Sequence, residues 1–225
     1  MDLQAQAAGI GALADQTRRA LYEYVVSRPE PVGREETAAA LGLAQHNVNF
    51  HLDRLVDEGL LETEFRRLSG RSGPGAGRPS KLYRRADREF AVSLPTRRYD
   101  LAGGILAAAV ELVADGMELP RALRQAAHAE GLSAGRASTR TTEEGPLTAT
   151  TRVLADHGYA PHVVDDVVSM SNCPFDALAQ KHTALVCGLN KDYVEGITDG
   201  LGCPEVTTSL EPAAGRCCVM LRGPR

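Results

Sequence analysis

The most reactive side chains in this sequence are five cysteines, and all of them lie between residue 173 and the end of the 225-residue chain. They are Cys173, Cys187, Cys203, Cys217 and Cys218. The first residues lack the basic cluster and apolar stretch of a secretory signal, so we expect a cytoplasmic protein, where structural disulfides are rare. The cysteines are then buried inert thiols, ligands of a metal or iron–sulfur site, or a reactive redox pair.

The local sequence indicates which of Cys173, Cys187 and Cys203 are the better candidates for ligands. Pro174 suits the first position of a helix, which would place Cys173 at the helix N-terminus, where the partial positive charge lowers a thiol pKa. Cys203 follows Cys187 by 16 residues along a helix predicted to begin near Thr183. At 1.5 Å per residue the two sulfurs would be roughly 24 Å apart, so we expect Cys203 to be the weakest ligand.

The last two cysteines, Cys217 and Cys218, are adjacent at the start of a predicted strand over residues 217–221. Neighbouring side chains on a strand point to opposite faces of the sheet. We therefore expect only one of the two to reach a given site.

A second group of residues suits nucleic acid, because residues 66–88 hold eight basic residues and one acid in a chain with a formal charge of −4. The eight are Arg66, Arg67, Arg71, Arg78, Lys81, Arg84, Arg85 and Arg88. Such a run can be an ordinary solvated loop, but it also concentrates positive potential that attracts phosphates.

The residues just before this basic run predict a helix from about 44 to 58 with an apolar face that contains Val48 and Leu52. The opposite face carries polar and aromatic side chains that can contact base edges, with Arg, Asn and Gln able to make bidentate hydrogen bonds. These residues are Gln45, His46, Asn47, Asn49, Phe50 and Arg54. The alternative is an ordinary polar helix face, but solvated faces are normally richer in Lys and Glu.

Two further helices are predicted ahead of this one, over about 11–27 and 34–41, with Gly42 as the turn between the second and third. Two strands, over about 60–68 and 81–85, follow and enclose a loop rich in glycine and proline. Such a hairpin would lie along DNA phosphates and add affinity rather than sequence choice. We expect it to contribute the basic residues Arg66, Arg67, Arg78, Lys81 and Arg84.

The stretches LADQTRRALYEYV, LGLAQHNVNFHLDRLVDEGLL and GRPSKLY resemble the winged-helix domains of bacterial ArsR-like and DeoR-like transcription regulators. The resemblance covers about the first 90 residues and implies double-stranded DNA as a partner. One departure is Ala44, which stands where such helices often carry a Ser or Thr cap, at a cost of roughly 0.5–2 kcal/mol.

The second half of the chain predicts helices over about 99–115, 120–130 and 146–157, with a polar connection between the last two. Strand-like patterns at about 159–170, 205–210 and 217–221 flank two helices at about 175–182 and 183–201. The predicted fold class is therefore α+β, with a winged helix-turn-helix domain over residues 1–95 and a mixed α+β sensor and dimerisation domain over residues 96–225.

The stretches SNCPFDALAQKHTALVC, LGC and AAGRCCVML resemble the sensor domain of the iron–sulfur cluster-assembly (suf operon) repressors. This resemblance implies a [4Fe–4S] cluster held by C-terminal cysteines. It aligns Cys173, Cys187 and Cys217 with ligand positions, and Cys203 with a further cysteine of some members. Regulators with similar NCPF and RCC stretches hold zinc or bind no metal, so zinc stays an alternative.

Three thiolates leave a fourth ligand position, for which His182, Cys218, a water or a small thiol are the candidates. Iron–sulfur clusters prefer four thiolates, whereas zinc readily accepts three cysteines and one histidine.

The leading hypothesis is a homodimeric DNA-binding regulator, and not an enzyme, whose operator affinity depends on a cysteine-ligated centre. Two half-sites are expected because one winged helix buries too little surface for tight specific binding. A second hypothesis replaces the metal centre by a pocket for a small organic ligand, and a third is a thiol enzyme using Cys173 with His182 or His157 as base. No membrane span is expected, because the longest apolar run, 101–114, carries Glu111 and is shorter than the roughly 20 residues required.

Overall fold

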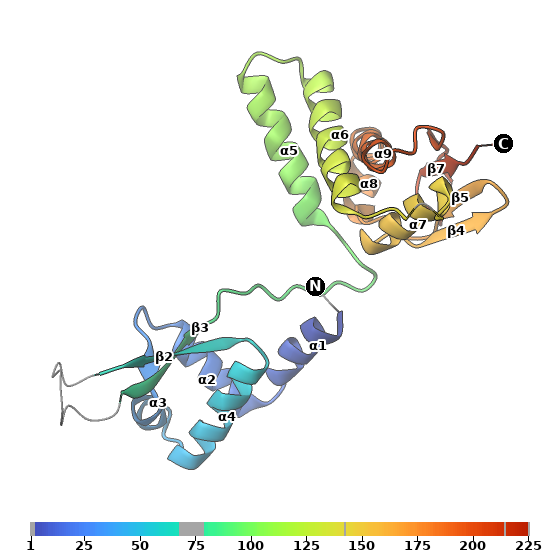
Figure 1. The fold of residues 1–225 in the computed structure, drawn as a ribbon. Helices are drawn as coiled ribbons and strands as arrows, with labels where there is room; N and C mark the ends of the chain where they lie inside the picture. The colour runs from blue at the N-terminus through green and yellow to red at the C-terminus, as the bar shows by residue number, and fades with distance from the viewer. Residues whose placement is uncertain (1–2, 68–78, 142, 214, 225) are drawn as a thin grey trace. The chain divides into compact units, whose positions relative to one another are not determined.

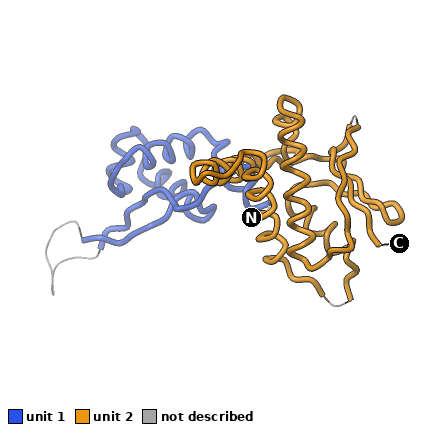
Figure 2. Tube along the Cα trace, turned by 90° about the horizontal axis from the view of Figure 1, so that it is seen from above, with its two compact units in different colours: residues 1–92 blue, residues 93–225 orange. Residues whose placement is uncertain are grey.

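The computed structural model of the chain describes residues 3–67, 79–141, 143–213 and 215–224. The fold is α+β, and the chain divides into two compact units, residues 1–92 and 93–225 (Figure 2). The boundary lies three residues before the division at 95 that the sequence predicts. None of the described helices is long and apolar enough to cross a membrane.

The first unit contains a helix-turn-helix followed by a β-hairpin (Figure 1). Its elements are α1 (Leu3–Ala12), α2 (Gln16–Val26), β1 (Val32–Gly33), α3 (Arg34–Leu41), α4 (Gln45–Asp57), β2 (Leu61–Arg66) and β3 (Ser80–Arg85). The three strands form an antiparallel sheet in the order β1-β3-β2. The predicted helices at 34–41 and 44–58 and both predicted strands are present within one or two residues.

Two glycines end the helices of this motif because they adopt a left-handed backbone. Gly42 has φ +63° and turns the chain from α3 to α4. Gly59 has φ +73°, and the next amide, of Leu60, donates to the carbonyl of Leu55 at 2.9 Å. A residue with a Cβ would be strained at either position.

The core of the first unit is formed by the apolar faces of α2 and α4 closing on the sheet. Leu21, Val48, Leu52, Leu55 and Tyr83 are fully buried there. Burial of this stripe fixes which side of α4 remains exposed, as the spacing of Val48 and Leu52 predicts.

The single helix predicted over 11–27 is wrong, because the chain forms two helices in this region, α1 and α2. Asp15 ends the connection between them, and its Oδ1 accepts a hydrogen bond from the amide of Arg18 at 2.9 Å. This N-cap starts a new helix instead of continuing the preceding one.

The second unit packs helices beside a four-stranded antiparallel sheet of order β4-β5-β7-β6 (Figure 1). Its elements are α5 (Tyr99–Ala114), α6 (Leu119–Ala137), α7 (Pro146–Asp156), β4 (Pro161–Val164), β5 (Val167–Met170), α8 (Asp176–Lys181), α9 (Thr183–Gly200), β6 (Thr207–Leu210) and β7 (Val219–Arg222). Glycines let α6 and α9 approach closely, since a Cβ at Gly131 would lie 2.0 Å from the carbonyl oxygen of Tyr193.

Three sequence-based boundaries are wrong in the second unit. Helix α6 extends to Ala137 instead of about residue 130. The predicted strand pattern at 159–170 is a hairpin of β4 and β5, with Asp165 in the turn at φ +55°. Strand β7 begins at Val219, so Cys217 and Cys218 precede it, and the alternation of a strand does not govern their side chains.

Candidate DNA-binding face and cysteine cavity

The side of α4 that points away from the core is polar and accessible. We call Gln45, His46, Asn47, Asn49, Phe50 and Arg54 the recognition face. Gln45, His46, Asn47 and Arg54 are exposed, and 67% of the Phe50 surface is accessible. An aromatic ring this exposed beside amide side chains suits contact with thymine methyl groups and base edges.

Asn49 differs from its neighbours on the recognition face. It is half-buried, and its Oδ1 is buried without a hydrogen-bond partner among the described residues. Asn49 therefore offers DNA less of its side chain than Asn47 does.

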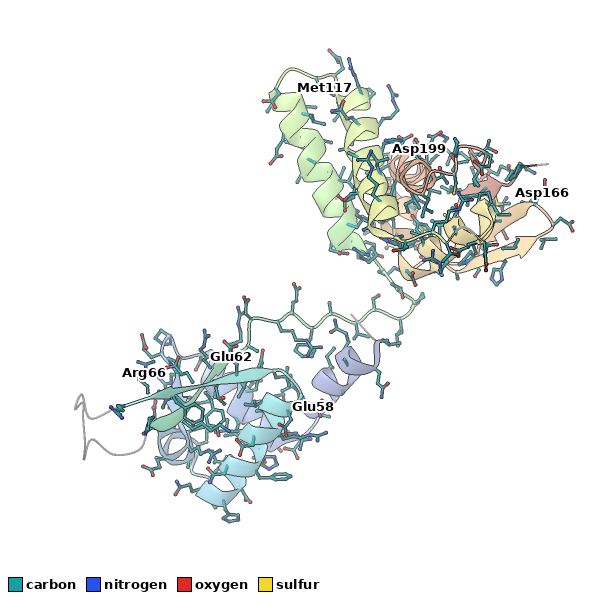
Figure 3. All side chains as sticks on the ribbon, viewed as in Figure 1. Glu58, Glu62, Arg66, Met117, Asp166 and Asp199 are labelled. Atoms are coloured by element: carbon teal, nitrogen blue, oxygen red, sulfur yellow. The ribbon has the colours of Figure 1, made fainter. Side chains whose placement is uncertain are left out.

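Two arginines of the hairpin, Arg66 and Arg84, pair with acidic side chains of the same unit. Figure 3 labels Arg66, Glu62 and Glu58 in this unit. Arg66 lies 2.7 Å from Glu64 and 3.4 Å from Glu30, and Arg84 lies 2.6 Å from Glu62. Arg54 of the recognition face pairs with Glu58 at 2.5 Å.

Exposed pairs of this kind are worth only about 0–1 kcal/mol, so phosphates can displace the carboxylates at little cost. Arg67 is also exposed, whereas Arg71 and Arg78 lie outside the described residues.

Lys81, predicted as a phosphate contact, bonds to α4 in this structure. Its Nζ donates to Oδ1 of Asp53 at 2.8 Å. The same carboxylate accepts from Nη2 of Arg34 at 2.8 Å and from the hydroxyl of Tyr83 at 2.8 Å. This cluster joins α3, α4 and β3 around one carboxylate.

The cluster shifts the pKa of Asp53, Tyr83 and Arg34. Burial opposes the charge of Arg34, but its hydrogen bonds to Tyr83 and Asp53 outweigh burial and raise its pKa. Burial opposes ionisation of Asp53, but the hydrogen bonds from Lys81 and Tyr83 and the charge of Arg34 outweigh it and lower the pKa. Burial and the hydrogen bond to Asp53 raise the pKa of Tyr83 to about 12. The carboxylate is therefore charged at neutral pH and keeps both cations in place.

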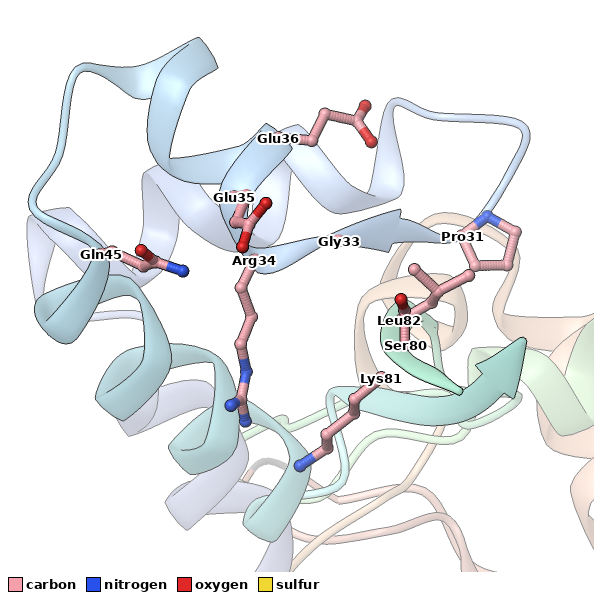
Figure 4. Close-up of a pocket in the computed structure, with 9 residues that line it drawn as sticks. All are labelled: Pro31, Gly33, Arg34, Glu35, Glu36, Gln45, Ser80, Lys81 and Leu82. Atoms are coloured by element: carbon pink, nitrogen blue, oxygen red, sulfur yellow. The ribbon is translucent and has the colours of Figure 1, made fainter. Parts of the chain in front are cut away.

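Arg34 and Lys81 also line a cavity of about 400 Å³ between α3, α4 and β3 (Figure 4). Its other residues are Pro31, Gly33, Glu35, Glu36, Gln45, Ser80 and Leu82. Gln45 belongs to the recognition face, so the cavity borders the surface expected to meet DNA. Sequence reasoning missed Arg34, because a single arginine in the first turn of a helix carries no motif.

In the second unit, four of the five cysteines line one cavity of about 510 Å³. Cys173 precedes α8, Cys187 lies in α9, and Cys217 and Cys218 precede β7. The remaining residues of this cysteine cavity are Asp176, Ala179, Gln180, Thr183, Pro212, Ala213, Gly215 and Arg216. The expectation that only one of Cys217 and Cys218 reaches a given site is wrong, because both lie ahead of the strand.

The thiols of the cysteine cavity interact in pairs. The hydrogen bond from Cys173 outweighs burial and, together with the amide of Val219 and the side chain of Asn190, lowers the pKa of Cys217 to about 7. The same hydrogen bond and burial raise the pKa of Cys173. Burial and the hydrogen bond with Cys218 raise the pKa of Cys187 to about 12.

The sequence-based expectation of a lowered pKa at Cys173 is therefore wrong. Helix α8 is only six residues long and begins at Asp176, so Cys173 does not lie at its first turn. The thiol whose pKa is lowered in this structure is Cys217, which receives several hydrogen bonds instead of a helix dipole.

Cys203 and His182 lie apart from the cysteine cavity. Cys203 is fully buried, and its Sγ accepts a hydrogen bond from Nη1 of Arg140 at 3.4 Å. His182 is exposed between α8 and α9 and is not among the described residues that line the cavity.

The four cysteines of the cysteine cavity are the side chains that could hold a metal ion or an iron–sulfur cluster. A zinc ion needs its ligands within about 2.3 Å of one point, and the described residues contain no group of three His, Cys, Asp or Glu side chains arranged to hold one ion. A [4Fe–4S] cluster binds each thiolate to a different iron and so accepts sulfurs distributed around a cavity. Cys173, Cys187, Cys217 and Cys218 supply four such sulfurs.

Residues 13–64 are similar to a helix-turn-helix domain family. The match extends from just before α2 into β2, and so includes the whole recognition face. A comparison with curated proteins finds no match. The similarity supports a DNA-binding transcription regulator, and it covers only residues of the first unit.

Proposed function

We propose that this protein is a cytoplasmic, homodimeric transcription regulator of the suf-repressor type, whose hold on its operator depends on a [4Fe–4S] cluster in the cysteine cavity. The observation that carries the sensing part is the gathering of Cys173, Cys187, Cys217 and Cys218 around one cavity, from three separate segments of the chain. All five cysteines are free thiols, which agrees with a reducing compartment.

DNA contact is assigned to the recognition face for base reading and to the hairpin for the backbone. Asn47, Phe50 and Arg54 project from α4 where a major groove would meet them. Arg66 and Arg84 on the hairpin would exchange carboxylates for phosphates, and the exposed Arg67 would add a further phosphate contact. Lys81 keeps its predicted role as a phosphate contact, and we add Arg34 beside it at the border of the recognition face.

The cluster would be held by Cys173, Cys187 and Cys217, with Cys218 as the fourth ligand in preference to His182. When bound, it would supply redox and oxygen sensitivity to the domain. Loss of the cluster would leave four thiols free to separate, since they come from segments far apart in the sequence. Separation of these segments would change the conformation of the second unit, and this change would report whether the cluster is bound.

Dimerisation is assigned to α5, which contacts α6 extensively but leaves a long apolar face uncovered. Val110 is 64% exposed and Val113 38% exposed. Gly103, Gly104, Ala107 and Ala108 add small exposed residues, and Asp100 and Glu111 are the only charges in the helix. A second copy is the occupant we propose, because an operator with two half-sites requires two recognition helices.

The test is purification without oxygen, followed by iron and sulfide analysis, an absorption spectrum and operator binding before and after cluster removal. We expect a brown protein with about four irons per chain. We also expect a change of at least tenfold in operator affinity when the cluster is lost. A colourless protein with the same affinity before and after chelation would contradict the proposal.

A second candidate function, sensing of a small organic ligand, is supported by the size of the cysteine cavity. Its volume of about 510 Å³ lies in the range of small-molecule pockets. Operator release by an organic effector in a metal-free protein would support this alternative.

The thiol-enzyme alternative has weaker support. Cys173 interacts with Cys217 instead of with a histidine, and Nδ1 of His157 is occupied by the hydroxyl of Tyr193 at 2.7 Å.

A further inference from the structure

Asn190 is a buried amide whose two polar groups both bond to distant side chains. It lies in α9, three residues after Cys187, and only 1% of its surface is exposed. The buried threonines of the same unit, Thr150 and Thr198, bond instead to carbonyls of their own helices. A buried amide is costly unless it is fully hydrogen-bonded. Because an apolar residue at position 190 would avoid this cost, the amide points to a role other than helix formation.

Tyr159 fixes the orientation of the Asn190 side chain. The hydroxyl of Tyr159, itself 4% exposed, donates to Oδ1 of Asn190. With the hydroxyl donating to the amide oxygen, the NH₂ group of Asn190 points the other way. There Nδ2 donates to Sγ of Cys217 at 3.2 Å.

A chain of hydrogen bonds therefore runs from Tyr159 through Asn190 to a sulfur of the cysteine cavity. An N–H group aimed at a ligating sulfur stabilises negative charge on it and fixes its position, and such outer contacts tune metal affinity and reduction potential. Asn190 does not line the cavity itself, so it acts only through Cys217.

We infer that Asn190, held by Tyr159, is a positioning residue that aims Cys217 at the bound centre and raises the reduction potential of that centre. The inference deepens the proposed function and rests on it. The reduced cluster carries one more negative charge than the oxidised one, so the N–H···S hydrogen bond stabilises the reduced state more strongly.

The variants are chosen so that folding is preserved. Replacing Asn190 alone would leave the buried Tyr159 hydroxyl without a partner, whereas replacing both partners by apolar residues of similar shape is nearly neutral. The test variant is therefore Tyr159→Phe/Asn190→Leu in the full chain. It is compared with the wild type, and Tyr159→Phe, which keeps the Asn190 amide but removes the hydroxyl that holds it, should give an intermediate result.

The first measurement is the midpoint potential of the cluster reconstituted without oxygen from iron and sulfide. We expect the double variant to have a lower potential than the wild type, and to hold iron about tenfold less tightly. A cluster that assembles in both proteins with equal potential and equal affinity would overturn the inference.

The second measurement does not need a cluster. In the metal-free protein, the side-chain amide resonances of Asn190 are compared by ¹H–¹⁵N NMR in the wild type and in Cys217→Ala. A downfield amide proton that moves upfield in Cys217→Ala supports the positioning of Cys217 by Asn190, and it does so separately from the proposed function, which the iron content tests. Identical resonances in the two proteins would overturn the inference.

Discussion

Asp53 of α4 and Lys81 of β3 are joined by a 2.8 Å hydrogen bond, so the recognition helix and the hairpin are tied through one carboxylate. Arg34 binds the same carboxylate from the start of α3. The three elements expected to touch DNA therefore share one polar anchor, and the charge of that anchor influences both stability and affinity.

Replacing Asp53 by Asn should destabilise the protein by about 1 kcal/mol at pH 7, because two cations lose a charged acceptor in a half-exposed cluster. The pKa of Asp53 lies below its ordinary value of 3.8, so its contribution is present above that pH and disappears as the pH falls through the lowered pKa.

Urea unfolding of the full chain between pH 7 and pH 3 measures this contribution. The difference between wild type and Asp53→Asn should be constant near neutrality and shrink below about pH 4. Asp57→Asn, one helical turn further along α4, is the matched control. An equal loss in both variants would show that helix charge, and not the anchor, is responsible.

Replacing Asn47 by Ala should reduce operator discrimination by about 1–3 kcal/mol, because a base-edge contact is lost. Replacing Arg67 by Ala should weaken operator and random DNA equally and reduce the salt slope by about 1. Binding isotherms at several salt concentrations on both DNAs separate these effects. If both variants change the two affinities equally, the division between base and backbone contacts is wrong.

Replacing Cys217 or Cys173 by Ser should abolish cluster incorporation, because either change removes a sulfur from the cysteine cavity. Replacing Cys203 by Ser is the matched control, since that sulfur bonds to Arg140 outside the cavity. Iron per chain is the measurement, with circular dichroism to confirm folding. Full iron content in Cys217→Ser would refute its role as a ligand.

The fourth ligand is decided by two single variants. Cys218→Ser should lower iron content or make the cluster unstable, whereas His182→Ala should leave it unchanged, because His182 is exposed away from the cavity. The opposite pattern would assign the fourth position to the histidine.

Replacing Val110 by Glu should convert a dimer to a monomer, because it places a charge in the middle of the exposed face of α5. Val164→Glu is the matched control, since Val164 is 67% exposed on β4, outside that face. Light scattering of both variants gives the mass directly. Dissociation by Val164→Glu, with Val110→Glu still dimeric, would assign the interface to the sheet instead.

The sequence by itself determined the features that depend on neighbours along the chain. The apolar stripe with Val48 and Leu52 determined which side of α4 is buried, and Gly42 and Gly59 ended α3 and α4 because few other residues adopt a left-handed backbone. The recognition face was predictable for the same reason, since a helix fixes the direction of each side chain from its position.

Only the tertiary structure decided the features that depend on residues far apart in the sequence. It brought Asn190 to Cys217, gathered Lys81 and Arg34 on Asp53, and placed Cys217 and Cys218 on one cavity by starting β7 two residues later than predicted. Hydrogen bonds and pKa shifts arise from neighbours in three dimensions. The helix pattern around Cys173 could not show that its thiol bonds to Cys217. The sequence determined which residues carry the chemistry, and packing decided which of them act together.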